Sequence, residues 1–228
     1  MNLALLEELQ RARLNKIPVA LVTDLDSGAQ GLVFAHSQHT ADLPLDSPRV
    51  DQVRELLRSA RCGTLADSTL FVRSYVADYR LLIIGAVHIA QALATLALAC
   101  GYQVTVIDPR RAFATEDRFH NVELRVEWPD EAMARLSLDA QTAVVTLAHD
   151  PKIDDPALVS ALNSEAFYIG ALGSRRTHEK RLERLTELGL GDQLARIKAP
   201  IGLDLGGRSH AEIALAILAQ LVQVRYNG

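Results

Sequence analysis

Two turns in this sequence carry residues that could bind an anionic ligand. The first is Gly85-Ala86-Val87-His88, which is followed 23 residues after its glycine by Asp108. In dinucleotide-binding turns, glycines let the backbone approach the pyrophosphate, and a carboxylate about 20 residues later binds the ribose. Val87 stands at the second glycine of that motif, where a branched side chain pushes a phosphate outward. The turn is either a reshaped nucleotide site or only a connection between a strand and a helix.

The second turn is Gly173-Ser174-Arg175-Arg176. Ser174 is a good N-cap for a helix, yet two arginines and His178 fill its first turn, where the helix dipole already supplies about half a positive charge. Acidic residues would stabilise that turn better, so the cations favour a phosphate or carboxylate site. The alternative is that the arginines pair with Glu179 or Glu183 along the helix.

The elements around these turns alternate between strand and helix from residue 81 onward. Apolar strands are expected at 81–84, 103–108, 122–128, 142–150 and 166–173, and helices at 88–100, 156–163, 174–188 and 209–224, with a short one after Pro129. This alternation predicts an α/β fold with an open, doubly wound and mainly parallel sheet. Ligands bind such sheets outside the carboxyl ends of the strands.

Three more groups of residues belong to that edge of the predicted sheet. Arg110 follows Asp108 at the end of the second strand, and His149 with Asp150 ends the fourth, where the pair could transfer a proton or cap the next helix. Asp204 lies in the turn before the last helix, where it could contact the ligand or fix its own loop. We expect the cofactor-binding residues among these and the two turns.

Residues 1–78 are expected to form a smaller α/β domain, and residues 79–228 the larger one. The chain has 228 residues, a net charge of -4, 49% hydrophobic residues and two cysteines. The net charge gives no sign of a nucleic-acid surface, and no apolar run is long enough to span a membrane. The small number of cysteines is typical of a protein in a reducing cytoplasm. Cys62 could be an exposed thiol, and Cys100 is expected to pack. No metal-site or catalytic-triad pattern is present.

Several blocks resemble the XdhC/CoxF (also called CoxI) family of maturation factors for xanthine and carbon monoxide dehydrogenases. They are LLIIGAVHIAQALA, VTVIDPR, VVTLAHDPKIDDPAL, FYIGALGSRRTHEKRLERL and RIKAPIGLDLGGRSHAEIALAILAQ, and they span about residues 80–225. Two departures stand out. The family's usual turn is G-A-G-H-x-A, so Val87 differs from it, and the family's glycine-rich N-terminal stretch, which often carries a cysteine, is not found in residues 1–78.

The resemblance implies a Rossmann-like C-terminal domain that binds molybdenum cofactor. It also implies that the protein assists the cofactor's sulfuration and its insertion into a molybdenum hydroxylase, with a cysteine desulfurase as a further partner and a homodimer as a possible state. Such a protein is a chaperone without a catalytic cycle of its own. Two alternatives remain: an NAD(P)-dependent oxidoreductase that uses Asp108 for the ribose, and a docking module without a small-molecule ligand.

Overall fold

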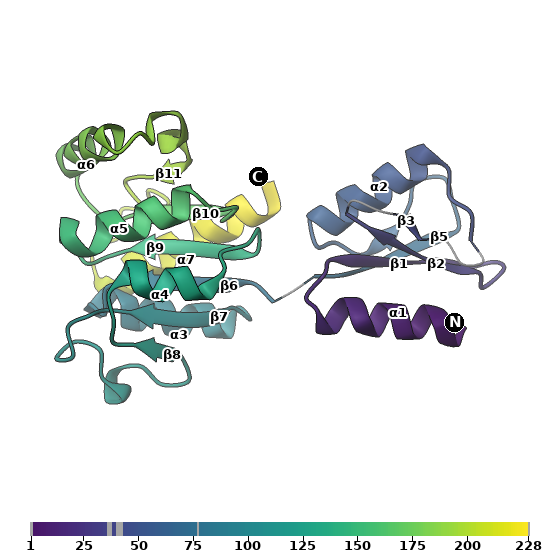
Figure 1. The fold of residues 1–228 in the computed structure, drawn as a ribbon, viewed down its shortest axis with the longest axis horizontal. Coiled ribbons are helices and arrows are strands. Elements are labelled where there is room, and N and C mark those ends of the chain that lie inside the picture. Colours follow the sequence, from purple (N-terminus) through teal and green to yellow (C-terminus); the bar gives the residue numbers. More distant parts are fainter. Residues whose placement is uncertain (1, 36–37, 40–42, 77, 228) are drawn as a thin grey trace. The chain divides into compact units, whose positions relative to one another are not determined.

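The computed structural model describes residues 2–35, 38–39, 43–76 and 78–227. The chain divides into two compact units, Met1–Ala77 and Asp78–Gly228. Each unit has its own sheet and its own buried apolar clusters (Figure 1). No helix in the described ranges is long and apolar enough to cross a membrane.

The N-terminal unit is an antiparallel sheet covered by a helix on each face. Its strands lie in the order β3-β2-β1-β5-β4. Its elements are α1 (Leu3–Leu14), β1 (Val19–Asp24), β2 (Gln30–Phe34), β3 (Gln38–His39), α2 (Ser47–Arg58), β4 (Gly63–Thr64) and β5 (Leu70–Tyr75). Val19 and Leu21 of β1 belong to the cluster that includes α1, and the alternating Ala20 and Val22 to the cluster that includes α2. Both faces are therefore apolar, which explains the continuous VALV run.

The C-terminal unit contains a six-stranded sheet whose strands pair in parallel throughout. The strands are β6 (Arg80–Ile84), β7 (Gln103–Ile107), β8 (Glu123–Arg125), β9 (Thr142–Thr146), β10 (Tyr168–Ala171) and β11 (Ile197–Lys198). Their order is β11-β10-β9-β6-β7-β8, so the chain reverses its direction of travel across the sheet between β6 and β9. That reversal is the position where doubly wound sheets bind ligands.

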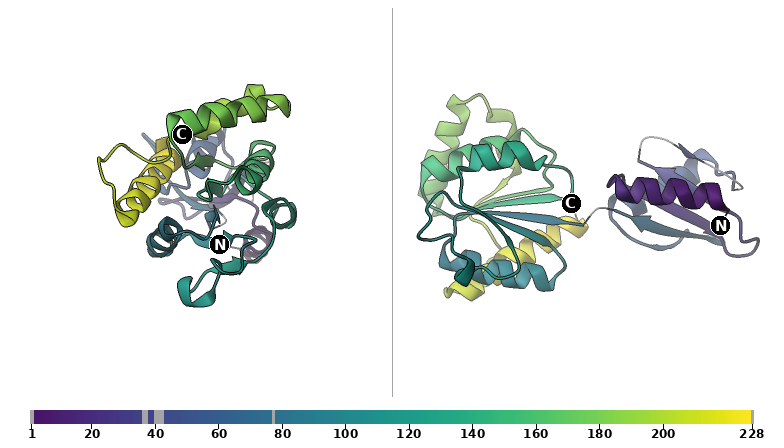
Figure 2. Two further views of the ribbon diagram at one scale, coloured as in Figure 1. Left: turned by 90° about the vertical axis from the view of Figure 1, so that its left-hand side faces the viewer. Right: turned by 60° about the horizontal axis from the view of Figure 1, so that its bottom comes forward.

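Helices cover both faces of this sheet, as expected for a doubly wound fold (Figures 1 and 2). The helical segments are α3 (His88–Ala99), η1 (Glu116–Arg118), α4 (Pro129–Leu136), α5 (Pro151–Leu162), α6 (Arg175–Glu187), η2 (Gly191–Arg196) and α7 (His210–Asn227). The helices α4 and α5 lie together on one face, and α3 and α7 pack against each other on the opposite face. The predicted fold class is confirmed.

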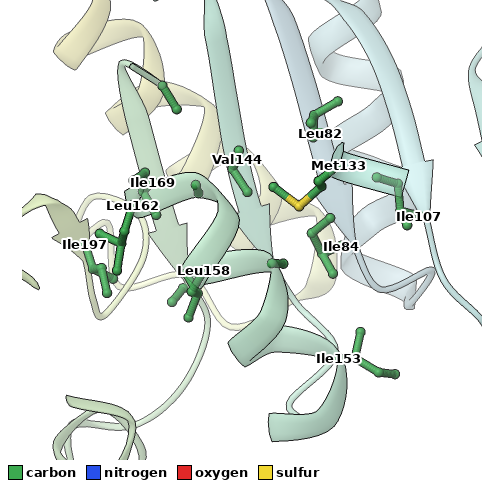
Figure 3. Packing of buried hydrophobic residues seen from close by; sticks show 14 of the residues in the cluster. Leu82, Ile84, Ile107, Met133, Val144, Ile153, Leu158, Leu162, Ile169 and Ile197 are labelled. Carbon is green, nitrogen blue, oxygen red and sulfur yellow. The ribbon is translucent and has the colours of Figure 1, made fainter. Parts of the chain in front are cut away.

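The core beneath α4 and α5 holds the strands of the site in place. Met133 of α4 and Leu158 of α5 point toward Ile84, Val144 and neighbouring strand residues, all of them buried (Figure 3). Burying a side chain of this size stabilises the fold by about 1.5–3 kcal/mol. The loops that leave the carboxyl ends of β6 and β9 therefore start from a rigid base.

The ends of three helices are defined by local contacts, and one of them corrects the expectation for Cys100. The N-cap of α2 is Asp46, whose side chain accepts a hydrogen bond from the Arg49 amide at 3.1 Å, and Ser47 is already inside the helix. Cys100 is exposed rather than packed, because it lies at the C-terminal end of α3. Ser209 and Glu212 form a capping box before α7, since each side chain accepts a hydrogen bond from the other residue's backbone amide.

Candidate functional site

Gly85 brings the loop after β6 against the loop after β9. Its φ of +101° is a conformation that side chains other than glycine rarely adopt. A Cβ atom added there would lie 2.8 Å from the backbone nitrogen of Ala148. Only glycine allows this approach, and it occurs at the reversal point of the sheet.

The start of α3 lacks the capping expected at a helix N-terminus. Val87 is the N-cap residue, it is half-buried, and it provides no side-chain hydrogen bond to the first turn. The first turn also carries no acidic residue. His88 is exposed and stacks on His210 of α7, with ring centroids 5.3 Å apart and an interplanar angle of 13°. Among the described residues no N-cap side chain bonds the first turn of α3, and His88 of that turn lies with His210 at the carboxyl edge of the sheet.

Asp108 is fully buried and its carboxylate is already occupied by the protein. Its Oδ2 accepts hydrogen bonds from the Ala86 amide and from Arg110 Nη2, both at 2.7 Å, and its Oδ1 accepts from the Arg110 amide and Nε at 2.9 Å. Burial alone would raise the pKa of Asp108, but the bonds from Arg110 and Ala86 hold that pKa below its usual range. A ribose would have to displace these donors to reach the carboxylate.

Arg110 joins that carboxylate to the acidic residues of the neighbouring loop. Its guanidinium lies over the ring of Phe113 at 4.5 Å, and its side chain is 34% exposed. Its pKa is raised by the hydrogen bonds to Asp108 and, more weakly, by the charges of Asp150 and Asp154. The loops after β7 and β9 are therefore electrostatically linked.

The loop after β9 takes an unusual backbone conformation at His149. The residue is exposed and has a φ of 61°, in the left-handed region. Asp150 caps α5 by accepting a hydrogen bond from the Lys152 amide at 3.0 Å, which is the capping role foreseen for this pair. Asp154, which the sequence did not single out, accepts hydrogen bonds from the amides of Ala148 at 3.2 Å and His149 at 3.0 Å.

The turn before α6 forms a positively charged helix start. Gly173 has a φ of +148°, and a Cβ atom there would lie 3.2 Å from the Thr177 side chain. Ser174 caps α6 by accepting from the Thr177 amide at 3.2 Å. Arg175 and Arg176 are exposed, and within the described ranges their side chains make neither a hydrogen bond nor an ion pair. The foreseen pairing with Glu179 or Glu183 does not occur there.

Arg181 is a second residue of this region that the sequence did not single out. It is 2% exposed, and its Nη2 donates to the Leu172 carbonyl at 2.9 Å. It shares the buried face of α6 with Leu185, four residues later. An arginine at an otherwise apolar helical position was the signal available in the sequence.

The structure brings most of the predicted site residues to the carboxyl edge of the sheet. Asp204 is the exception, because its carboxylate has no hydrogen-bond partner among the described residues. The β6, β7, β9 and β10 loops all leave carboxyl ends of adjacent parallel strands. Direct contacts join Gly85 to Ala148, Asp108 to Ala86, and the Leu172 amide to the Thr146 carbonyl at 2.9 Å. Asp204 is exposed, and its carboxylate accepts no hydrogen bond from any described residue, so the foreseen bonds to its own loop are absent.

A surface hollow of about 730 Å³ lies away from these loops. It is lined by residues that precede β9 and by the ends of α5 and η2, including Asp139, Asn163 and Arg196. The Arg196 guanidinium is satisfied by the carbonyls of residues 162, 164 and 166. The hollow is at the amino end of the strands, where α/β sheets rarely bind ligands, and none of the predicted site residues lines it.

Residues 81–221 match the family described as the XdhC Rossmann domain. The chain belongs to the XdhC family. The matched range contains every predicted site residue, from Gly85 to Asp204. The loops described above are therefore the loops of an XdhC Rossmann domain, and the resemblance noted in the sequence is confirmed.

Curated relatives share the C-terminal part of the chain. The molybdenum cofactor insertion chaperone PaoD of Escherichia coli is 37% identical over 147 residues, which are 64% of this chain and 40% of PaoD. A probable xanthine dehydrogenase subunit of Bacillus subtilis is 27% identical over 159 residues, which are 69% of this chain and 46% of that protein. The chain thus spans less than half the length of these relatives.

A solved structure shows the same fold across both units. The crystal structure described as a xanthine dehydrogenase from Bacillus halodurans has a TM-score of 0.73 and 23% identity to this chain. The match covers 98% of this chain and 68% of that one. At this level of identity the likeness concerns the fold alone.

Proposed function

We propose that this XdhC-family chain binds molybdenum cofactor and assists its insertion into a molybdenum hydroxylase of the xanthine or carbon monoxide dehydrogenase type. The observation that carries the proposal is the start of α6, where Arg175 and Arg176 are exposed and have no acidic partner among the described residues. The family membership and the similarity to an insertion chaperone support the choice of ligand.

The residues present fit the chemistry of that ligand. Molybdopterin carries a phosphate and an anionic dithiolene, and both need cations or free amides. The start of α6 offers two guanidinium groups and a helix dipole of the right sign. The uncapped start of α3 offers further amides beside His88. In this proposal Arg175 and Arg176 hold the phosphate, while the β6 and β9 loops contact the remainder of the ligand.

We further propose that the chain takes part in the steps before and after cofactor binding. The chain would hold the cofactor while it is sulfurated, with a cysteine desulfurase supplying sulfur, and would then pass it to the hydroxylase in the cytoplasm. A homodimer is part of the same proposal. His149, Arg175 and Arg176 are exposed, which is compatible with handing a ligand to a partner.

An NAD(P)-dependent activity is less well supported by the geometry. The strand order and the Gly85 turn suit a dinucleotide. However, Asp108, the residue that should bind the ribose, is buried and holds Ala86 and Arg110 instead. Val87 also occupies the position where a pyrophosphate approaches the backbone.

The proposal is tested by deleting the gene and purifying the dehydrogenase that depends on it. We expect the dehydrogenase to contain less inserted and sulfurated cofactor than the enzyme from the parent strain. Complementation with the Arg175→Ala/Arg176→Ala variant should fail to restore the content, whereas the unaltered chain should restore it. Normal cofactor content in the deletion strain would refute the maturation role.

A further inference from the structure

Two buried, oppositely charged residues lie behind the candidate site, on neighbouring helices. Asp154 is in the first turn of α5 and Arg181 in the second turn of α6, and each is 2% exposed. No direct ion pair joins them among the described residues, but the charge of each affects the pKa of the other. Both were absent from the sequence-based list of site residues.

Each of the two residues holds one of the ligand-facing loops. The Asp154 carboxylate accepts from the amides of Ala148 and His149, and so fixes the left-handed turn at His149. The Arg181 guanidinium donates to the Leu172 carbonyl, next to the turn that starts α6. Because the Ala148 backbone lies against Gly85, the position of the β9 loop also determines that of the β6 turn.

We propose that Asp154 and Arg181 are positioning residues that keep the β6, β9 and β10 loops in the arrangement that binds the ligand. This inference rests on the proposed function, because the ligand in question is the molybdenum cofactor. The two residues would act through the backbone of the loops and would not touch the ligand. Their role is thus distinct from that of Arg175 and Arg176.

The unsatisfied hydrogen-bonding groups of Arg181 and the raised pKa of Asp154 indicate that these residues do not serve mainly to stabilise the fold. Arg181 Nε and Nη1 are buried and have no hydrogen-bond partner among the described residues. Burial raises the pKa of Asp154 to about 6, against the opposing effects of Arg181 and the two amides. Buried charges with unsatisfied bonds are destabilising compared with apolar residues, and they are concentrated at functional sites.

Other charged groups near Asp154 have partners of their own. Asp155, its neighbour on α5, forms an ion pair with Arg184 at 2.5 Å, and Arg110 interacts mainly with Asp108. Asp150 is committed to capping α5. Protonation of Asp154 therefore removes the charge that holds the β9 loop and the counter-charge that acts most strongly on Arg181.

The first measurement uses the free protein, so it does not depend on cofactor binding. Amide hydrogen exchange of Ala148 and His149 is followed by NMR across pH 5–8 and corrected for the intrinsic exchange rate. The two amide bonds favour the ionised form of Asp154, so an opening that breaks them while Asp154 stays buried is favoured by protonation. We therefore expect the protection of both amides to fall as the pH falls through about 6, even though unfolding of the whole domain, which exposes Asp154 to water, becomes less favourable. In Asp154→Asn the protection should be lower at pH 7 and should not change over that range.

The second measurement is cofactor retention by the same variants at pH 7. Asp154→Asn should weaken retention roughly tenfold, as expected for the loss of a charged hydrogen bond. Asp155→Asn, which removes a neighbouring carboxylate without touching the β9 loop, should retain the cofactor like the wild type and keep its pH-dependent protection.

The outcomes separate this inference from the proposed function. If the wild type retains no cofactor, the proposed function fails, while the exchange experiment still decides whether Asp154 holds the loop. Protection that does not depend on pH in the wild type would overturn the inference, and this result needs no variant to fold. Equal cofactor retention by Asp154→Asn and the wild type would also overturn it.

Discussion

Asp108 and Asp154 show how the same side chain acquires opposite properties from its partners. Both are buried at the carboxyl edge of the sheet, and burial raises the pKa of each. Asp108 receives two direct bonds from the Arg110 guanidinium, so its pKa ends below the usual range. Asp154 has only backbone donors and a more distant Arg181, so its pKa stays near 6. One carboxylate is structural, and the other can titrate near neutral pH.

This difference predicts how stability depends on pH. The pKa of Asp154 is raised from 3.8 to about 6 in the folded protein, so the folded state binds the proton more readily than the unfolded state between these values. The contribution of Asp154 to the free energy of unfolding should therefore increase as the pH falls from about 7 to about 4, by roughly 3 kcal/mol at most. Urea unfolding of the wild type and Asp154→Asn measures this difference.

The variant Asp154→Asn replaces the carboxyl group of Asp154 with an amide that does not titrate. Asp154→Asn should lack this part of the pH dependence, and the curves of the two proteins should approach each other or cross toward low pH. Parallel curves from pH 4 to 7 would show that Asp154 titrates normally in the folded protein.

Only some residues of the candidate site could be predicted from the sequence. Gly85, Asp108, Ser174 and Arg175 could be proposed from the sequence because they follow strands, at the edge where doubly wound sheets bind ligands. Asp154 and Arg181 lie inside helices, and their importance comes from which loops they meet in three dimensions. Burial by tertiary packing leaves only a weak signal in the sequence, such as an arginine on an apolar helix face.

At the scale of elements, the β6 turn depends on a close approach between two backbones. Gly85→Ala should lower the free energy of unfolding by more than about 2 kcal/mol, because alanine both disfavours the φ of +101° and meets the Ala148 backbone. Gly101→Ala is the matched control. Its φ is +80°, but a Cβ atom there meets nothing within 4 Å, so only the conformational cost of about 1 kcal/mol applies.

Chemical denaturation of both variants compares these two costs. A loss for Gly85→Ala no larger than the loss for Gly101→Ala would show that the contact with Ala148 does not restrict the turn. A larger loss would support the view that the β6 and β9 loops are fixed together.

Most helices and strands could be located from the sequence because their signals are local. Apolar runs marked the central strands, and α3 ends at Ala99, one residue before the expected end. Boundaries were less accurate: β8 covers only Glu123–Arg125 within the expected 122–128. The conformation of His149 was not foreseen, because it is imposed by the Asp154 carboxylate from the next helix.

At the scale of the molecule, the two units have separate cores. Leu158 belongs to the cluster of the C-terminal unit, and Val53 to a cluster of the N-terminal unit. Leu158→Ala should destabilise the C-terminal unit by about 2–5 kcal/mol and leave the N-terminal unit nearly unchanged. Scanning calorimetry should show two transitions, of which this variant shifts one.

Val53→Ala provides the reciprocal control and should shift the other transition. A single transition that both variants shift equally would mean that the units unfold together.

The alternation of strands and helices in the sequence predicted a doubly wound sheet. The order of the strands in that sheet depends on pairing between distant segments, so it was established by the structure.

The start of α6 is the proposed binding site of the molybdenum cofactor. The most direct measurement is anaerobic gel filtration of the chain with purified cofactor, followed by quantification of the molybdenum and pterin that elute with the protein. We predict that the wild type retains the cofactor and that Arg175→Ala/Arg176→Ala loses most of it. Arg11→Ala/Arg49→Ala, which removes two exposed arginines from the N-terminal unit, should retain it like the wild type. Equal retention by the wild type and the Arg175/Arg176 variant would contradict cofactor binding at the start of α6. Saturable binding of NAD without retention of the cofactor would also contradict it.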